Sequence, residues 1–106
     1  MLVDMDPQGS ATQCLCPDRK SLEHTVLDLL IDSDGVSVAD VVIDIDDRLA
    51  VLPSDIVLST AEQVLAGSPA REQRLKRILD RLNGAYDFVI IDSPPNIGLL
   101  TFNVLM

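Results

Sequence analysis

Aromatic residues are scarce in this 106-residue chain, which has one Tyr, two Phe and no Trp, 3% in all. A core therefore cannot be built around large rings, and the 47% of hydrophobic residues must supply it as Leu, Ile, Val and Ala. This aliphatic bias is typical of parallel strands buried between helices. The length predicts one small domain with a modest core.

Cysteine and histidine are also few. Cys14 and Cys16 are the two cysteines, and His24 is the one histidine, which we expect to be exposed. A disulfide framework or a four-ligand zinc site would need more such residues. We interpret both cysteines as free thiols in a reducing cytoplasm. Without a long apolar run or a signal-peptide pattern, no membrane association is expected and the cytoplasm is the predicted compartment.

Positively charged residues are also scarce. The chain has 8 Lys and Arg against 17 Asp and Glu, which gives a net charge of −9. Nucleic-acid binders usually carry a basic face, so we expect no direct DNA binding by this chain. Five of the 8 basic residues lie between Arg71 and Arg81. We interpret them as the solvated face of a helix, supported by a Glu72–Lys76 pair, with contact to DNA or a partner as the alternative.

Acidic residues also cluster at Asp44, Asp46 and Asp47. A cation site is one interpretation of this cluster. We favour a turn before the next strand, because runs of acids between apolar segments are usually solvated.

The apolar pattern along the chain predicts alternating strands and helices. Strands are expected at residues 1–4, 48–53 and 86–92, the last buried on both faces. Helices are expected at residues 22–30, with Ser21 as N-cap, and at 58–65, 71–82 and 98–106. The first half of 11–20 fits a helical turn, and 38–43 fits a helix or a strand. This order predicts an α/β fold with a parallel β-sheet flanked by helices.

Carboxylates follow two of the predicted strands, as Asp4 and Asp6 after the first and Asp92 after the last. Ligands of open parallel sheets bind beyond the carboxyl ends of the strands. An apolar strand that ends in Asp is typical of sites where hydrated Mg²⁺ lies beside nucleotide phosphates. Asp4 would then help to place the metal shell, and Asp6 would orient the attacking water. The alternative is that these acids are helix caps or solvent-facing strand ends.

Three segments resemble motifs of the ParA-type ATPases of the ParA/MinD superfamily. Residues 3–12 (VDMDPQGSAT) resemble their second nucleotide motif, and residues 86–95 (YDFVIIDSPP) resemble their Walker-B strand. Residues 96–105 resemble the switch segment and the helix that follows. Residues 52–54 and Glu62 match the strand-Pro-Ser and acidic-helix pattern between them. The motifs agree in order and spacing over the whole chain.

The resemblance implies a P-loop NTPase fold of the SIMIBI type and a dimerising Mg²⁺-dependent ATPase. Such enzymes position plasmids or chromosomes with a ParB-like partner and DNA. By this resemblance Asp6 would be the catalytic, water-orienting acid, and Asp4 and Asp92 would serve magnesium. The residues expected to shape the switch loops around the γ-phosphate of ATP are Pro7, Gln8, Pro94 and Pro95.

One family feature is missing from residues 1–106, which contain no Gly-rich, Lys-bearing run to cradle phosphates. Both ends also interrupt a predicted element, so we expect a single incomplete α/β domain, the central part of a longer protein. We predict that this polypeptide alone does not hydrolyse ATP. A missing neighbouring strand would leave open edges, which predicts a homo-oligomer, strand exchange or poor solubility.

Two other interpretations stay open. The chain fits a non-enzymatic interaction or structural module derived from a truncated ParA paralogue. It also fits a fragment of a MinD-like or capsular-polysaccharide-type relative, although Asp6-Pro7-Gln8 favours the ParA type.

Overall fold

A computed structural model describes residues 1–18 and 22–106 of the chain. Strands and helices alternate in it much as the sequence predicts. The strands are β1 (Leu2–Asp4), β2 (Ile43–Asp44), β3 (Ala50–Leu52) and β4 (Ile90–Asp92). The α-helices are α1 (Ser10–Leu15), α2 (Val26–Ile31), α3 (Val38–Val41), α4 (Ala61–Val64), α5 (Arg74–Asp80) and α6 (Leu99–Leu105). The 3-10 helices are η1 (Ile56–Thr60) and η2 (Arg71–Gln73).

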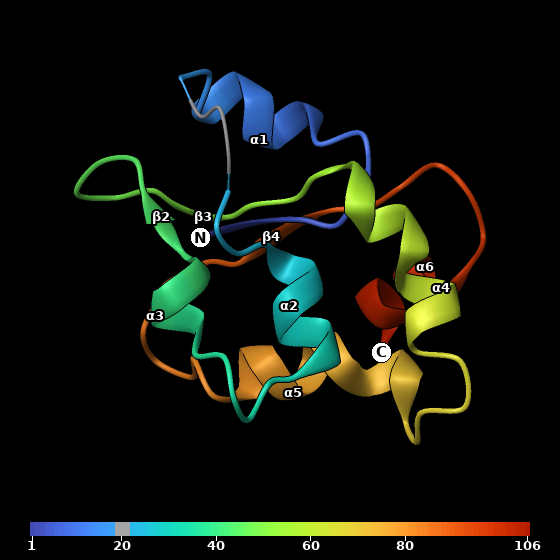
Figure 1. The fold of residues 1–106 in the computed structure, drawn as a ribbon. Coiled ribbons are helices and arrows are strands. Elements are labelled where there is room, and N and C mark those ends of the chain that lie inside the picture. The colour runs from blue at the N-terminus through green and yellow to red at the C-terminus, as the bar shows by residue number, and fades with distance from the viewer. Residues whose placement is uncertain (19–21) are drawn as a thin grey trace.

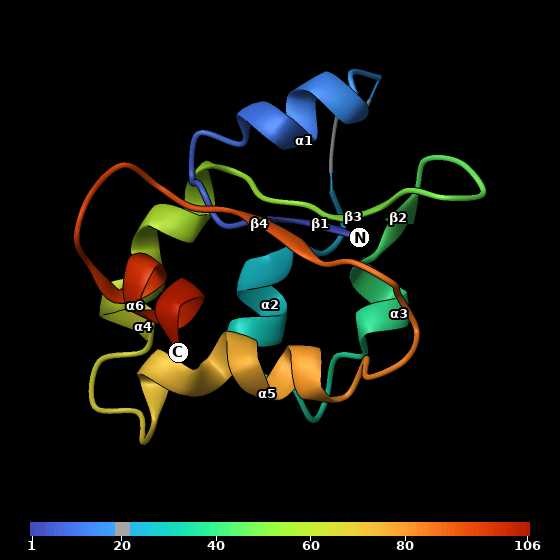
Figure 2. The same ribbon diagram turned by 180° about the vertical axis from the view of Figure 1, so that it is seen from behind.

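The strands form one sheet with the order β2-β3-β1-β4. β1 pairs in parallel with both β3 and β4, whereas β2 pairs antiparallel with β3. The sheet is therefore mixed rather than purely parallel, because β2 and β3 are joined by a tight hairpin. Both views of the ribbon place α1 on one face of the sheet and α2 to α6 on the other (Figures 1 and 2). The predicted α/β fold with flanking helices is confirmed.

The core lies between the sheet and the helices α2, α4, α5 and α6. Val3 and Leu52, neighbours on β1 and β3, are fully buried and face this layer. The buried hydrophobic side chains of the described residues are Met, Val, Leu, Ile and Ala, so the aliphatic core is confirmed. Among the described helices, none has the length and apolarity needed to cross a bilayer.

Two helices begin differently from the prediction. Ser21, the predicted N-cap, lies outside the described residues, and α2 instead begins after Thr25. The Thr25 hydroxyl accepts from Leu27 N (3.3 Å), and Asp28 accepts from Thr25 N (2.7 Å), which together form a capping box. The helix predicted at 71–82 is divided into η2 and α5, but its apolar stripe is confirmed, with Leu75 and Ile78 buried.

The charged residues of α5 pair differently from the predicted Glu72–Lys76 bond. Glu72 bonds Arg71 (3.2 Å), because both belong to the preceding 3-10 turn, and Lys76 instead reaches Asp80 (3.3 Å). Arg81 pairs with Asp34 in the loop after α2 (2.7 Å). These exposed pairs agree with a solvated helix face.

The prediction that residues 86–92 form a strand buried on both faces is wrong. β4 begins only at Ile90, and Phe88 and Ile90 are 79% and 65% exposed. The reason is that β4 is an edge strand of the described sheet, with β1 as its neighbour, and Ile90 lies on the face opposite the core. Residues 38–43, for which helix and strand were both open, divide into α3 and the start of β2.

Candidate functional site

Asp4 and Asp92 are neighbours at the carboxyl ends of two adjacent parallel strands. They are register partners across β1 and β4, and Met5 N donates to Asp92 O (2.8 Å) in the same ladder. Two residues 88 positions apart are therefore brought together, as their strand-end positions predict.

Asp4 is fully buried and both of its carboxylate oxygens accept backbone hydrogen bonds. Oδ1 accepts from Asp6 N (3.1 Å), and Oδ2 accepts from Thr12 N (2.9 Å) in the first turn of α1. Gly9, the residue before α1, has no side chain with which to cap it, so Asp4 satisfies one of the free amides at the start of the helix. Asp4 thus fixes both the Asp6 loop and α1.

Asp6 lies in the loop between β1 and α1, partly exposed. Its Oδ1 accepts from Gln8 N (3.0 Å). Its backbone oxygen accepts from Gly9 N (2.9 Å) and from Ser54 Oγ (2.8 Å). The loop is therefore held in place from β3 as well as from within.

Negative charge accumulates at this edge of the sheet. Burial raises the pKa of the Asp92 carboxyl, and the nearby negative charges of Asp4 and then Asp6 raise it further. The ion pairs of the described residues join none of these three acids to a Lys or Arg. A cation is therefore the charge that would best complement the group.

A cleft of about 480 Å³ adjoins Asp6. The loop after β1, the loop after β4, the segment from η1 to α4 and the start of α6 line it, so the four residues predicted to shape the switch loops line one cavity. They are Pro7, Gln8, Pro94 and Pro95. Asp4 and Asp92 do not line this cleft, and lie at the strand ends behind it.

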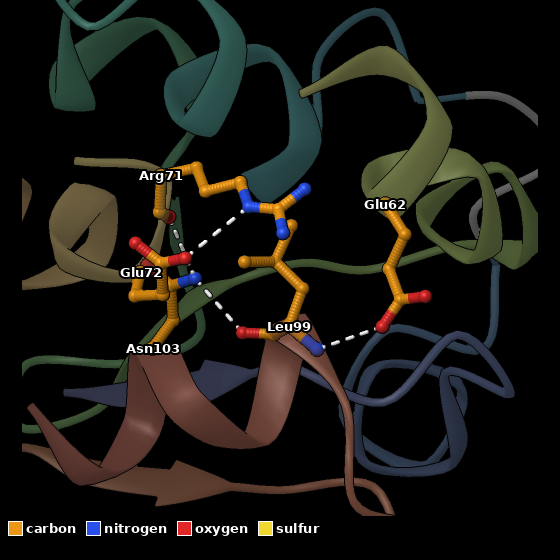
Figure 3. A network of polar contacts seen from close by, with 5 residues as sticks. All are labelled: Glu62, Arg71, Glu72, Leu99 and Asn103. Carbon is orange, nitrogen blue, oxygen red and sulfur yellow. Dashed lines mark hydrogen bonds and ion pairs between the residues drawn. The ribbon is translucent and has the colours of Figure 1, made fainter. Parts of the chain in front are cut away.

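Two polar side chains join α6 to neighbouring helices (Figure 3). The resemblance already pointed to Glu62, whereas Asn103 was not singled out. Glu62 of α4 lines the cleft, and its Oε1 accepts from Leu99 N at the start of α6 (2.8 Å). Asn103, 2% exposed, donates from Nδ2 to Arg71 O and Leu99 O (both 2.9 Å) and accepts from Leu75 N (3.1 Å). An Asn within an apolar helix stripe is the one sequence signal that could have found this contact.

The other candidate residues stay apart from this site. Cys14 and Cys16 are free thiols on α1 and at its end, as predicted. His24 is partly buried rather than exposed, because it packs beside Asp28, with Nδ1 3.8 Å from Asp28 Oδ2. In the acidic cluster, Asp46 accepts from Arg48 N and Leu49 N (2.7 and 2.9 Å), which confirms the predicted turn.

Comparison with known proteins identifies the family. A family profile described as an AAA domain matches residues 1–106. The chain is 43% identical over 109 residues to the sporulation initiation inhibitor protein Soj of Bacillus subtilis (strain 168), covering 99% of this chain and 41% of Soj. The chain is a member of the ParA/MinD-type AAA domain family.

A further relative and a solved structure are similar to the chain over nearly its whole length. The chromosome partitioning protein ParA of Myxococcus xanthus is 37% identical over 106 residues, covering 99% of this chain and 37% of that protein. A crystal structure of cobyrinic acid a,c-diamide synthase from Mycobacterium smegmatis with bound ADP and magnesium matches with a TM-score of 0.87 and 40% identity. That match covers 96% of this chain and 41% of the solved one. The chain thus spans about two fifths of the length of these relatives.

Proposed function

We propose that this chain supplies the magnesium- and water-positioning part of a ParA-type ATPase that acts in plasmid or chromosome partitioning. The observation that carries the proposal is the register pairing of Asp4 with Asp92, with Asp6 in the loop that follows β1. Membership of the ParA/MinD-type family supports it. A non-enzymatic module of the same fold is the alternative.

The three acids fit magnesium by their chemistry. Mg²⁺ prefers carboxylate and water oxygens, keeps several of its waters and needs one or two acids. The described residues contain no group of three or more His, Cys, Asp or Glu side chains that could hold a metal together. A site with Asp92 as the main ligand and water-mediated contact to Asp4 therefore fits better than a full protein cage, because both oxygens of Asp4 already accept hydrogen bonds.

Each residue has a separate part in this proposal. When bound, magnesium would neutralise charge on the phosphate oxygens. Asp6, with one carboxylate oxygen bonded to Gln8 N, would accept a hydrogen bond from the attacking water and orient it. The rings of Pro7, Pro94 and Pro95 would shape the cleft wall and exclude bulk water.

The test is a titration of the ¹⁵N-labelled chain with MgCl₂, followed by NMR. We expect the amide signals of Asp6, Asp92 and their neighbours to shift, and Asp92→Asn to abolish the shift. Asp44→Asn, which removes one exposed carboxylate elsewhere, is the control for charge alone. Equal shifts in Asp92→Asn and in the unchanged chain would exclude the proposed metal site.

A second measurement addresses catalysis directly. We expect no release of phosphate from Mg-ATP by this chain in a malachite-green assay, because residues 1–106 carry no phosphate-binding run of Gly and Lys. Turnover that disappears in Asp6→Ala would contradict this expectation. A ParB-like partner and DNA belong to the proposal for the longer proteins of the family.

We also expect self-association, with a second copy of the chain as the partner. Phe88 and Ile90 are exposed beside the unpaired edge of β4, and open apolar edges favour pairing with another chain. Multi-angle light scattering should show a dimer or larger species, reduced in Phe88→Lys but not in Val57→Lys, which places the same charge at an exposed position on η1. A compact monomer that is insensitive to salt would contradict this expectation.

A further inference from the structure

One short segment, residues 54–62, touches both loops of the candidate site. It begins at Ser54, two residues after the end of β3, and ends in α4. We call it the connecting segment. Its two ends make side-chain hydrogen bonds to different loops, and this arrangement carries the inference.

At its first end, the connecting segment is bonded to the loop after β1. Ser54, 2% exposed, donates from Oγ to Asp6 O (2.8 Å) and from its backbone N to Thr12 Oγ1 (3.0 Å). Ser54 O also lies against Gly9, where an added Cβ would be 3.2 Å away. A shift of the Asp6 loop therefore cannot leave Ser54 unmoved.

The middle of the connecting segment is well ordered by its own contacts. Asp55 accepts from Val57 N (3.1 Å) and so caps η1, and Thr60 Oγ1 donates to Val57 O (2.7 Å). Leu58 and Ala61 are buried at 0% and 1% exposure. η1 continues into α4 without a break, so one continuous helical run joins Asp55 to Glu62.

At its second end, the connecting segment holds the start of α6. Glu62 Oε1 accepts from Leu99 N, one of the amides that a helix start leaves free (Figure 3). Gly98, the residue before α6, has an extended backbone with a φ of −172°, which any residue can adopt. A Cβ on Gly98 would lie 2.7 Å from Glu62 Oε1, so the Glu62 carboxylate sits directly against the start of α6.

We propose that Ser54 and Glu62 are positioning residues that couple the Asp6 loop to the loop at 93–98 and the start of α6. A change at the Asp6 loop would pass through Ser54 to the connecting segment and through Glu62 to Leu99. The inference deepens the proposed function and rests on it: a ligand bound at the Asp6 loop would also order the second wall of the cleft.

Amide hydrogen exchange, followed by NMR without magnesium or nucleotide, tests the coupling. The amides of Gly9 and Leu99 report on the two loops, and Leu52 in the sheet reports on global stability. We expect Glu62→Ala to speed exchange at Leu99 about tenfold, since a hydrogen bond to a charged group is lost. Glu62→Gln should stay near the unchanged chain, because its side-chain oxygen still accepts.

The decisive variant is Ser54→Ala, which changes a residue remote from α6. We expect it to speed exchange at Leu99 by about twofold or more, by loss of one neutral hydrogen bond. This effect should disappear in the Glu62→Ala background. Ser59→Ala removes the same hydroxyl from an exposed position of the same segment, and should change neither Gly9 nor Leu99.

Three results would overturn the coupling. Ser54→Ala could affect Gly9 and leave Leu99 unchanged, it could act on Leu99 equally in the Glu62→Ala background, or it could speed Leu52 by the same factor. If Ser54→Ala affects Leu99 as expected but the amide signals do not shift with magnesium, the proposed function is contradicted and this inference is not. If the amide signals shift with magnesium but Ser54→Ala leaves Leu99 unchanged, this inference is contradicted and the proposed function is not.

Discussion

The two loops that follow β1 and β4 begin with paired aspartates yet differ in how they are held. The loop at 5–9 is anchored at both ends: Asp4 before it is fully buried, Met5 and Gly9 are buried, and Ser54 bonds the backbone between them, although Gln8 is exposed. The loop at 93–98 is open, with Pro95 and Asn96 exposed and Ile97 87% exposed. Its described side-chain bonds lie at its far end, from Leu99 N to Glu62 and from Thr101 to Asn96 O.

This difference separates a preorganised half of the site from an adaptable half. A buried carboxylate whose two oxygens both accept backbone hydrogen bonds fixes the groups bonded to it. Exposed backbone with few partners opens at low free energy and takes the shape of what it contacts. We therefore expect the Asp6 loop to set the geometry of the site and the 93–98 loop to respond to a ligand.

Of the substitutions that test this difference between the loops, removal of the Asp4 carboxylate should lower stability most. Asp4→Ala leaves the buried amide of Thr12 and the partly buried amide of Asp6 without their acceptor, which should lower the free energy of unfolding by about 3 kcal/mol. Urea denaturation followed by circular dichroism measures the loss. Asp92→Ala is the comparison, and should cost much less, because the described hydrogen bonds of Asp92 involve its backbone.

Asp4→Asn keeps one oxygen as an acceptor and so should fall between the unchanged chain and Asp4→Ala. Equal losses in Asp4→Ala and Asp92→Ala would show that the first loop is no more firmly held than the second. The division into a preorganised and an adaptable half would then be wrong.

The adjacency of the two acids was predictable because it follows from strand polarity alone. Once residues 1–4 and 86–92 are assigned as parallel strands, their carboxyl ends share one edge of the sheet. The aliphatic core followed from composition in the same way. Local pattern was enough for both features.

The remaining features depend on packing between distant segments, which local pattern does not encode. Glu62 meets Leu99 across 37 positions of sequence, and only because α4 packs beside α6. The burial of β4 was mispredicted for a related reason. An apolar run such as Phe88–Ile91 is typical of a strand covered on both sides, but its actual exposure depends on which elements lie against it.

A substitution at Gly9 should have the next largest effect. Gly9 has a φ of 64°, and its missing Cβ would lie 3.2 Å from Ser54 O, a backbone atom that cannot move freely. Gly9→Ala therefore adds a clash to the cost of the left-handed conformation, and should destabilise the chain by about 2 kcal/mol. The measurement is again the urea midpoint.

Gly84→Ala is the matched control, because Gly84 has a similar φ of 82° and no atom within 4 Å of the added Cβ. It should cost about 1 kcal/mol, from backbone conformation alone. The difference between the two variants measures how tightly Ser54 is packed against the first loop. Equal losses of stability in the two variants would mean that Ser54 moves aside readily, and would contradict a preorganised Asp6 loop.

The smallest expected effect is a gain in stability when Asp92 loses its charge. The pKa of Asp92 is raised above its ordinary value of 3.8 by burial and then by the charges of Asp4 and Asp6. The folded chain therefore holds this proton to a higher pH than the unfolded chain does. Ionised Asp92 lowers stability above its folded pKa, and the loss vanishes as the pH falls below about 3.8.

Asp92→Asn should accordingly raise the urea midpoint at pH 7 and give little gain at pH 3. Asp44→Asn changes the net charge equally at an exposed position, and should give a smaller gain at pH 7. Added MgCl₂ should narrow the difference between Asp92→Asn and the unchanged chain, because a cation relieves the same repulsion that the substitution removes. A loss of stability in Asp92→Asn would mean that this carboxylate makes favourable contacts, and the second loop would then be held more like the first.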